Sequence, residues 1–228
     1  MLQIPLVTET AAQLSQRIEQ RFPVSGLGRV ADEIVSECQN TAARIASLSR
    51  PVWWLRAANT VLVAGILAIG VYLATHMSMR LRLNDMERFI QFIEPALGSM
   101  VFIGAGLFSL WSLETRWKRR WVLQALHTLR SLAHVIDMHQ LTKDPERLLL
   151  EGPDTESSPK RTMSNFELGR YLDYCSEMLS LLGKLAAIWA EKFTDPEVQR
   201  AVDQLENLTS GLSRKIWQKM MILTRSEP

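Results

Sequence analysis

The sequence predicts an all-α integral membrane protein, in which a two-helix transmembrane hairpin carries a cytoplasmic helical bundle with a coiled-coil hairpin. Residues 57–75 contain no charged side chain, and neither do residues 95–113. As a helix each run would be about 28 Å long, close to the hydrocarbon thickness of a bilayer. The flanking sequences show apolar residues at three- and four-residue steps, as amphipathic helices do. The alternative is a soluble bundle with two fully buried central helices.

Composition sets limits on function. The chain has 228 residues, of which 47% are hydrophobic, and a formal net charge of +2. This charge is too small to indicate nucleic-acid binding, and no basic stripe with interleaved aromatic residues is present. Cys38 and Cys175 are expected to be small buried hydrophobic residues rather than a disulfide. Met1 to Val7 is too short and lacks the basic start of a signal peptide, so the first span is expected to direct targeting.

Three regions follow from these patterns. Residues 1–50 are predicted to form N-terminal cytoplasmic amphipathic helices, residues 51–115 the hairpin, and residues 116–228 a C-terminal cytoplasmic bundle. The spans are expected at about 54–76 and 93–114. The first N-terminal helix is expected to begin near Thr8 as its cap and to end at Phe22. The second carries a predicted core-facing stripe of Val30, Ile34, Cys38, Ala42, Ile45 and Leu48.

The second span is expected to continue into the bundle, because residues 107–143 contain neither glycine nor proline. Its predicted buried residues there are Leu123, Leu126, Leu129, Ala133, Ile136 and Leu141. Residues 144–146 resemble a helix start, and residues 152–161 a flexible connection. Ser164 to Glu167 predicts a capping box, after which two helices share a coiled-coil-like apolar seam. This pattern indicates an antiparallel helical hairpin.

Aromatic and basic residues flank both spans and are expected to lie at the lipid interface. They are Trp53, Trp54, Arg56, Trp111, Arg116, Trp117, Lys118, Arg119 and Arg120. Basic residues are fewer in the loop between the spans, so the positive-inside rule predicts that both termini are cytoplasmic. The expected location is therefore a membrane, as in the bacterial inner membrane.

Glu94 is the main candidate for the mouth of a pore. It precedes Pro95 at the outer mouth of the second span, and copies around a symmetry axis would form an acidic ring that attracts cations. The further residues expected to line such a pore are Gly98, Ser99, Ala105, Gly106 and Ser109. The alternative is an interfacial glutamate that caps the helix and faces water.

This Glu-Pro start of a second span resembles the mitochondrial calcium uniporter family. The likeness covers little more than the layout of the hairpin. That family has a Trp-Asp pair upstream, where this chain has Ile90 and Gln91, and the missing aspartate argues against calcium selectivity.

His127, His134 and Asp137 fall on one face of a predicted helix and could together hold a divalent metal. The alternative is that they are polar residues satisfied by neighbouring helices. No nucleotide-binding loop, metalloprotease signature, CxxC pair or nucleophile elbow is present, so we expect neither an enzyme nor a cofactor.

Three function hypotheses follow. The first is a homo-oligomeric ion-channel candidate, lined by the second span and gated by its cytoplasmic domain. The second is a non-conducting membrane-anchored scaffold or signalling subunit that recruits a cytoplasmic protein. The expected partners are the lipid bilayer, further copies of the chain and, under the second hypothesis, that cytoplasmic protein, but no nucleic acid. The third and least favoured hypothesis is a membrane enzyme that uses the cluster of His127, His134 and Asp137.

Overall fold

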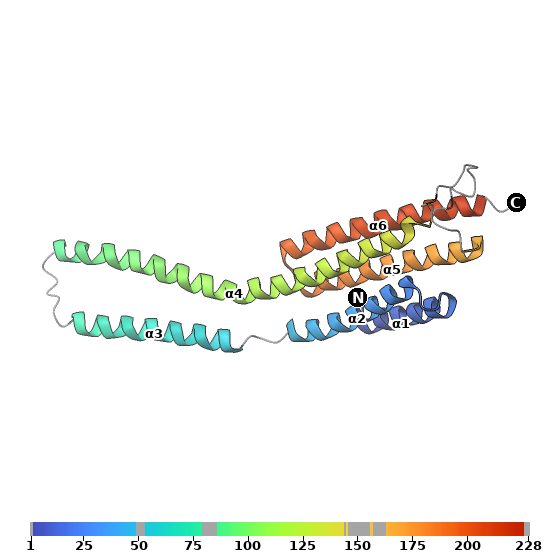
Figure 1. Cartoon of the computed structure of the whole chain (residues 1–228). Coiled ribbons are helices and arrows are strands. Elements are labelled where there is room, and N and C mark those ends of the chain that lie inside the picture. The colour runs from blue at the N-terminus through green and yellow to red at the C-terminus, as the bar shows by residue number, and fades with distance from the viewer. Residues whose placement is uncertain are drawn as a thin grey trace. The chain divides into compact units, whose positions relative to one another are not determined.

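The chain is all-α in the part that the computed structural model describes, which comprises residues 2–48, 53–78, 86–143 and 163–225 with residues 145 and 156. Six helices make up this part (Figure 1): α1 (Ile4–Arg21), α2 (Gly26–Leu48), α3 (Trp53–Ser78), α4 (Met86–Leu141), α5 (Asn165–Lys192) and α6 (Pro196–Arg225). The predicted helical class is confirmed. The predicted features at residues 144–146 and 152–161 lie outside the described residues, apart from residues 145 and 156.

The chain divides into two compact units. The bundle unit comprises Met1–Ser47 and Trp121–Pro228, and the hairpin unit comprises Leu48–Arg120. The helices before and after the uncharged runs thus belong to one folded unit, as their matching apolar stripes suggested. α4 contributes its first part to the hairpin unit and its last part to the bundle unit.

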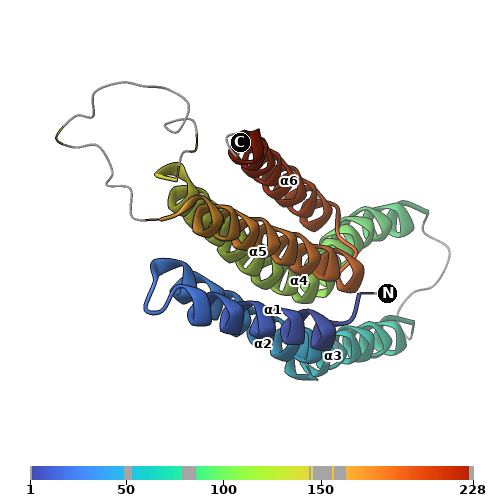
Figure 2. The same ribbon diagram turned by 90° about the vertical axis from the view of Figure 1, so that its right-hand side faces the viewer.

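The bundle unit is organised around α5. α1 packs against one side of α5 and α6 packs against the other side of α5, as Figure 2 shows. The interior is aliphatic, and Trp189 and Tyr174 are its largest fully buried side chains. Of the seam predicted for α5, the buried members are Leu172, Cys175, Leu179, Leu182, Ala186 and Trp189. The helical bundle is therefore confirmed.

α1 begins four residues before the predicted start. Gln3 is its N-cap, and Pro5 lies in the first turn, where its fixed φ suits a helix and its missing N–H costs nothing. Thr8 is inside the helix, and its hydroxyl donates to the carbonyl of Ile4 at 3.0 Å. The prediction that Thr8 caps this helix was wrong, because the proline gives an earlier start.

The turn from α1 to α2 brings α2 against α4. Val24 has a φ of 56°, a left-handed conformation that is costly for a β-branched residue, and its side chain is 95% exposed. At Gly26 an added Cβ would lie 2.6 Å from Cε1 of His139. A side chain at Gly26 would therefore displace the ring of His139.

The predicted stripe of α2 is shifted in its second half. Val30, Ile34 and Cys38 are buried as expected, but Ala42 is exposed and Thr41 is fully buried instead. A period of 3.6 residues drifts from a strict four-residue step, so the buried face moves back by one residue after three turns.

α4 is one uninterrupted helix of 56 residues, which confirms the predicted continuation beyond the second span. Leu126, Leu129, Ala133 and Ile136 are buried. Leu123 is only half-buried, and Leu141 is 63% exposed at the end of the helix, where the prediction of burial was wrong. Pro95 lies within α4, so this helix does not begin there.

Both helices of the C-terminal hairpin start with side-chain caps. The Ser164 hydroxyl accepts from the backbone N–H of Glu167, whose carboxylate accepts from the backbone N–H of Ser164, which confirms the predicted capping box. At α6, Oδ1 of Asp195 accepts from the backbone N–H groups of Glu197 and Val198. These caps satisfy amides that have no partner inside a helix, and so fix where each helix begins.

Candidate functional site

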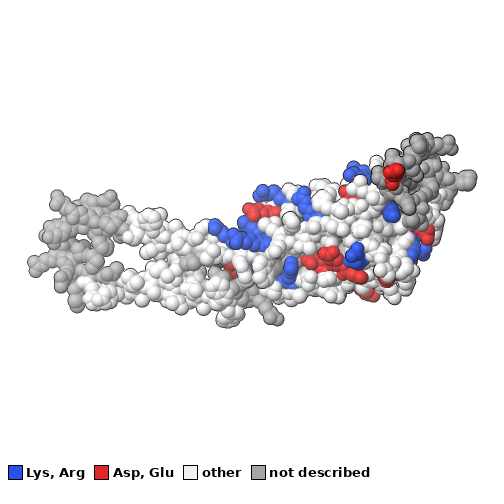
Figure 3. All heavy atoms as spheres, viewed as in Figure 1, with Lys and Arg blue, Asp and Glu red and all other residues white. Residues whose placement is uncertain are grey.

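The hairpin unit leaves the apolar side chains of its uncharged runs exposed. Val61 on α3 is 72% exposed, and Val101 and Phe102 on α4 are 70% and 81% exposed. In Figure 3 the described residues of these runs form a surface almost free of charge, whereas charges are scattered over the bundle unit. A soluble monomer rarely exposes an apolar patch of this extent, which marks a membrane or protein contact.

An ion-pair triad connects α3 with α4 at the charged ends of both runs. Oε2 of Glu114 lies 3.6 Å from Nε of Arg56, and its Oε1 lies 2.8 Å from Nζ of Lys118. The run of residues 57–75 directly follows Arg56 in α3, and the run of residues 95–113 directly precedes Glu114 in α4. The two 19-residue runs are therefore in register, because both reach their charged end at this pair.

By length and composition, one helix of the described part qualifies as a candidate membrane span. This helix is Leu97–Leu141, and no part of its most apolar 18-residue window is buried. The apolar stretch Arg56–Tyr72 of α3 is too short to meet the same criterion. These criteria give weak evidence for membrane integration. The two-span hairpin stays a prediction.

The residues predicted to line a pore all lie on α4. The side chain of Glu94 is not among those described. Gly98, Ser99, Ala105, Gly106 and Ser109 are all exposed. Gly98, Ala105 and Ser109 share one side of the helix, and so does Phe102, which the prediction did not include. A bulky ring thus occupies the middle of the small-residue face.

The predicted lipid-interface residues lie at the same end of the hairpin unit as the triad. Trp53, Trp54 and Trp117 are 79%, 70% and 45% exposed. The guanidinium of Arg56 and the ammonium of Lys118 both pair with Glu114. Arg116 and Arg120 are exposed, whereas Arg119 is half-buried. The side chain of Trp111 is not described. Exposed tryptophans beside cations are typical of a membrane–water interface.

The predicted metal cluster is not assembled in the described residues. His127 and His134 are exposed, and Oδ1 of Asp137 accepts from Nε2 of Gln140 at 2.6 Å. No group of three or more histidine, cysteine or acidic residues in the described part is placed to hold a metal ion.

His139, which the metal prediction did not include, is half-buried in the bundle unit. Its Nδ1 lies 3.4 Å from the hydroxyl of Tyr171. Burial, followed by the charges of Arg29 and Lys143, lowers the pKa of His139. This histidine thus lies where α2, α4 and α5 meet, in surroundings that disfavour its charged form.

A polar cleft between α1 and α5 was not predicted from the sequence. Arg17 and Arg21 line it from α1, and Arg170 and Tyr174 line it from α5. Each pair is four residues apart and so shares a helix face. That spacing is the only signal in the sequence, and it does not reveal that the two faces meet.

No family model matches the chain, and neither the curated proteins nor the solved structures compared with it include a significant match.

Proposed function

We propose that the chain is a two-pass membrane protein that forms a homo-oligomeric pore lined by α4 and gated by the bundle unit. The observation that carries this proposal is the continuity of α4, which runs from an exposed uncharged segment into a buried position in the bundle without a break. A continuous helix shared by both units would transmit a displacement of the bundle to the membrane segment.

The membrane part of the proposal is supported by the register of the two uncharged runs. Arg56 and Glu114 pair where both runs end, beside exposed tryptophans and arginines. Helices of this length satisfy their own backbone groups and can therefore lie in lipid. More basic residues lie on the triad side of the runs, which under the positive-inside rule supports a cytoplasmic bundle unit.

The pore part requires several copies, because two helices cannot enclose a water-filled path. The face of α4 formed by Gly98, Ala105 and Ser109 is small enough to border such a path. Phe102 would constrict it and act as a hydrophobic gate, which blocks ions by excluding water. Glu94 would lie toward the opposite, outer end of the span.

The first experiment is native mass spectrometry of the full chain in nanodiscs. A ring of four or more subunits supports a pore and directs electrical recording to two variants. Glu94→Gln should lower cation conductance, and Phe102→Ala should raise basal conductance. Glu191→Gln, at an exposed position of α5, serves as the control. A ring whose conductance is absent, or is the same in all variants, contradicts the proposal.

A membrane-anchored scaffold is the second candidate function, favoured by the bundle unit itself. This unit has an aliphatic core of its own, built from α1, α2, α5, α6 and the last part of α4. A monomer or dimer in nanodiscs would favour this function, since neither leaves room for a pore. The bundle should then retain a specific protein partner when Glu94 and Phe102 are both replaced.

A further inference from the structure

The polar cleft of the bundle unit has the size of a small-molecule site. Its volume is about 640 Å³, within the range of roughly 300–1,000 Å³ typical of such sites. Eight residues line it: Arg17, Gln20, Arg21, Ser164, Phe166, Glu167, Arg170 and Tyr174. Three arginines against one glutamate give this lining a formal charge of +2. The three guanidinium groups supply N–H donors that an anion can bind.

Two of these arginines act on the same side chain, that of Tyr174. Burial raises the pKa of Tyr174, but the hydrogen bonding and the positive charges of Arg170 and Arg21 together outweigh burial, so the pKa lies below its ordinary value. Cζ of Arg170 also lies 5.1 Å from the centre of the Tyr174 ring, and Cζ of Arg21 lies 5.2 Å from that of Phe166. The aromatic rings thus hold two guanidinium groups in the lining of one cleft, where an anion would be attracted to both.

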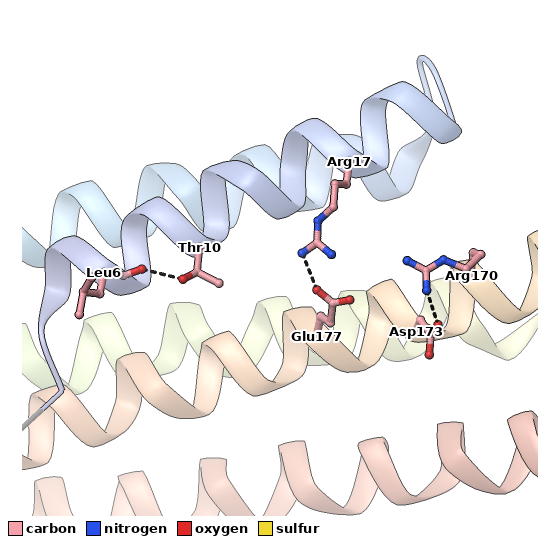
Figure 4. A network of polar contacts seen from close by, with 6 residues as sticks. All are labelled: Leu6, Thr10, Arg17, Arg170, Asp173 and Glu177. Carbon is pink, nitrogen blue, oxygen red and sulfur yellow. Dashed lines mark hydrogen bonds and ion pairs between the residues drawn. The ribbon is translucent and has the colours of Figure 1, made fainter.

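The carboxylates of Glu167, Asp173 and Glu177 equal the three arginines of the cleft in number, and two of these arginines are already paired with them. Figure 4 shows Arg17 donating to Glu177 at 2.8 Å and Arg170 donating to Asp173 at 2.9 Å, and neither carboxylate lines the cleft. Glu167 does line it, but its Oε2 accepts from the backbone N–H and the hydroxyl of Ser164. In the described part of the chain Arg21 forms no ion pair.

We propose that this cleft binds a small phosphate-bearing molecule, with Arg21 and Arg170 as its main ligands and Arg17 at its rim. Guanidinium groups bind phosphate oxygens through paired N–H donors, and several guanidiniums around one cleft match the several oxygens of a phosphate. A protein partner fits less well, because stable protein interfaces take about 20–30 residues a side. The proposal does not depend on whether the hairpin unit forms a pore.

The test uses the full chain in an uncharged detergent, with pyrophosphate as the probe at constant ionic strength. Calorimetry should show saturable binding, and pyrophosphate should raise the melting temperature. Arg21→Gln and Arg170→Gln should each weaken binding about tenfold or more, as loss of a charge-assisted contact does. Arg200→Gln, at an exposed position of α6, is the matched control and should bind like the unaltered chain.

Two further measurements separate specific binding from general charge attraction. Arg21→Lys keeps the charge but loses the paired donors, so its affinity should fall below that of the unaltered chain. Bound pyrophosphate should also raise the pKa of Tyr174, seen as a later rise of tyrosinate absorbance that is absent in Tyr174→Phe. Equal effects of sulfate or chloride, no saturable binding, or unchanged affinity in both glutamine variants would overturn the proposal.

Discussion

Nζ of Lys219 on α6 donates a hydrogen bond of 2.9 Å to the backbone carbonyl of Gln140, in the last turn of α4. It also reaches the carbonyl of Lys143 at 3.4 Å. Carbonyls at a helix C-terminus have no partner inside the helix and carry the negative end of its dipole. One ammonium group therefore satisfies the end of α4 and attaches it to α6.

Replacing Lys219 with methionine should destabilise the bundle unit. The variant leaves a partly buried carbonyl without its charged donor, and we expect the free energy of unfolding to fall by about 1–2 kcal/mol. Chemical denaturation followed by circular dichroism measures this change. Lys215→Met, at an exposed position one turn earlier, should stay within about 0.5 kcal/mol of the unaltered chain. Equal stability of the two variants would show that the Lys219 contact contributes nothing.

The capping box of α5 should make stability depend on pH in the acid range. Hydrogen bonds from the backbone N–H and then the hydroxyl of Ser164 lower the pKa of Glu167 from its ordinary value of 4.5. A carboxylate with a lowered pKa stabilises the fold above its unfolded pKa, and this contribution disappears as the pH falls through the folded pKa.

The measurement is the free energy of unfolding of the unaltered chain and of Glu167→Gln from neutral to acid pH. The unaltered chain should be more stable near pH 7, and the difference should vanish as the pH falls below 4.5. In a Ser164→Ala background, which itself costs about 1 kcal/mol, the same difference should be smaller. A difference that is independent of pH would contradict the capping role.

Both thiols should be unreactive in the folded chain. Burial, followed by the charge of Glu37, raises the pKa of Cys38 to about 11, and burial raises that of Cys175 to about 12. Since the thiolate is the nucleophile, alkylation near pH 8 should be slow until the bundle unfolds. Mass spectrometry after a timed pulse of iodoacetamide measures the modification. A Ser131→Cys variant, with its thiol at an exposed position of α4, should react at once and provides the positive control.

Two leucines that look alike in sequence should differ in their effect on stability. Leu182 is fully buried in α5, whereas Leu141 is 63% exposed at the end of α4. Leu182→Ala should cost about 2–5 kcal/mol by leaving a cavity, and Leu141→Ala less than about 0.5 kcal/mol. Chemical denaturation of the two variants side by side measures this difference. A large loss for Leu141→Ala would indicate a contact beyond those of the described residues.

Periodicity was sufficient to predict the helices because an apolar face is a local property. Leu126, Leu129 and Ile136 could be predicted as buried, since they repeat at helical spacing between charged neighbours. Leu141 fits the same pattern, but whether another helix extends far enough to cover it depends on the lengths of the other elements. Thr8 was misassigned because a threonine can cap a helix, while Pro5 three residues earlier already starts one.

The candidate sites were less predictable because they join helices distant in the sequence. The uncharged runs are visible in the sequence, but the pairing of Arg56 with Glu114 depends on how two helices align. The arginine cleft likewise depends on α1 lying against α5, which places Arg21 and Arg170 at one tyrosine. Spacing identifies which residues share a face, and only packing decides which faces meet.

The unbroken path of α4 also determines which changes in its length the chain can tolerate. A single residue inserted between Glu114 and Val122 would rotate everything beyond it by about 100° and advance it by about 1.5 Å. The buried row of Leu126, Leu129 and Ile136 would then change its angular position along α4 relative to Glu114, although every side chain in it were retained. Seven inserted residues would nearly restore the helical phase, at an angular error of about 20°. An insertion of two whole turns would therefore keep the apolar faces of the two parts of α4 in nearly the same phase.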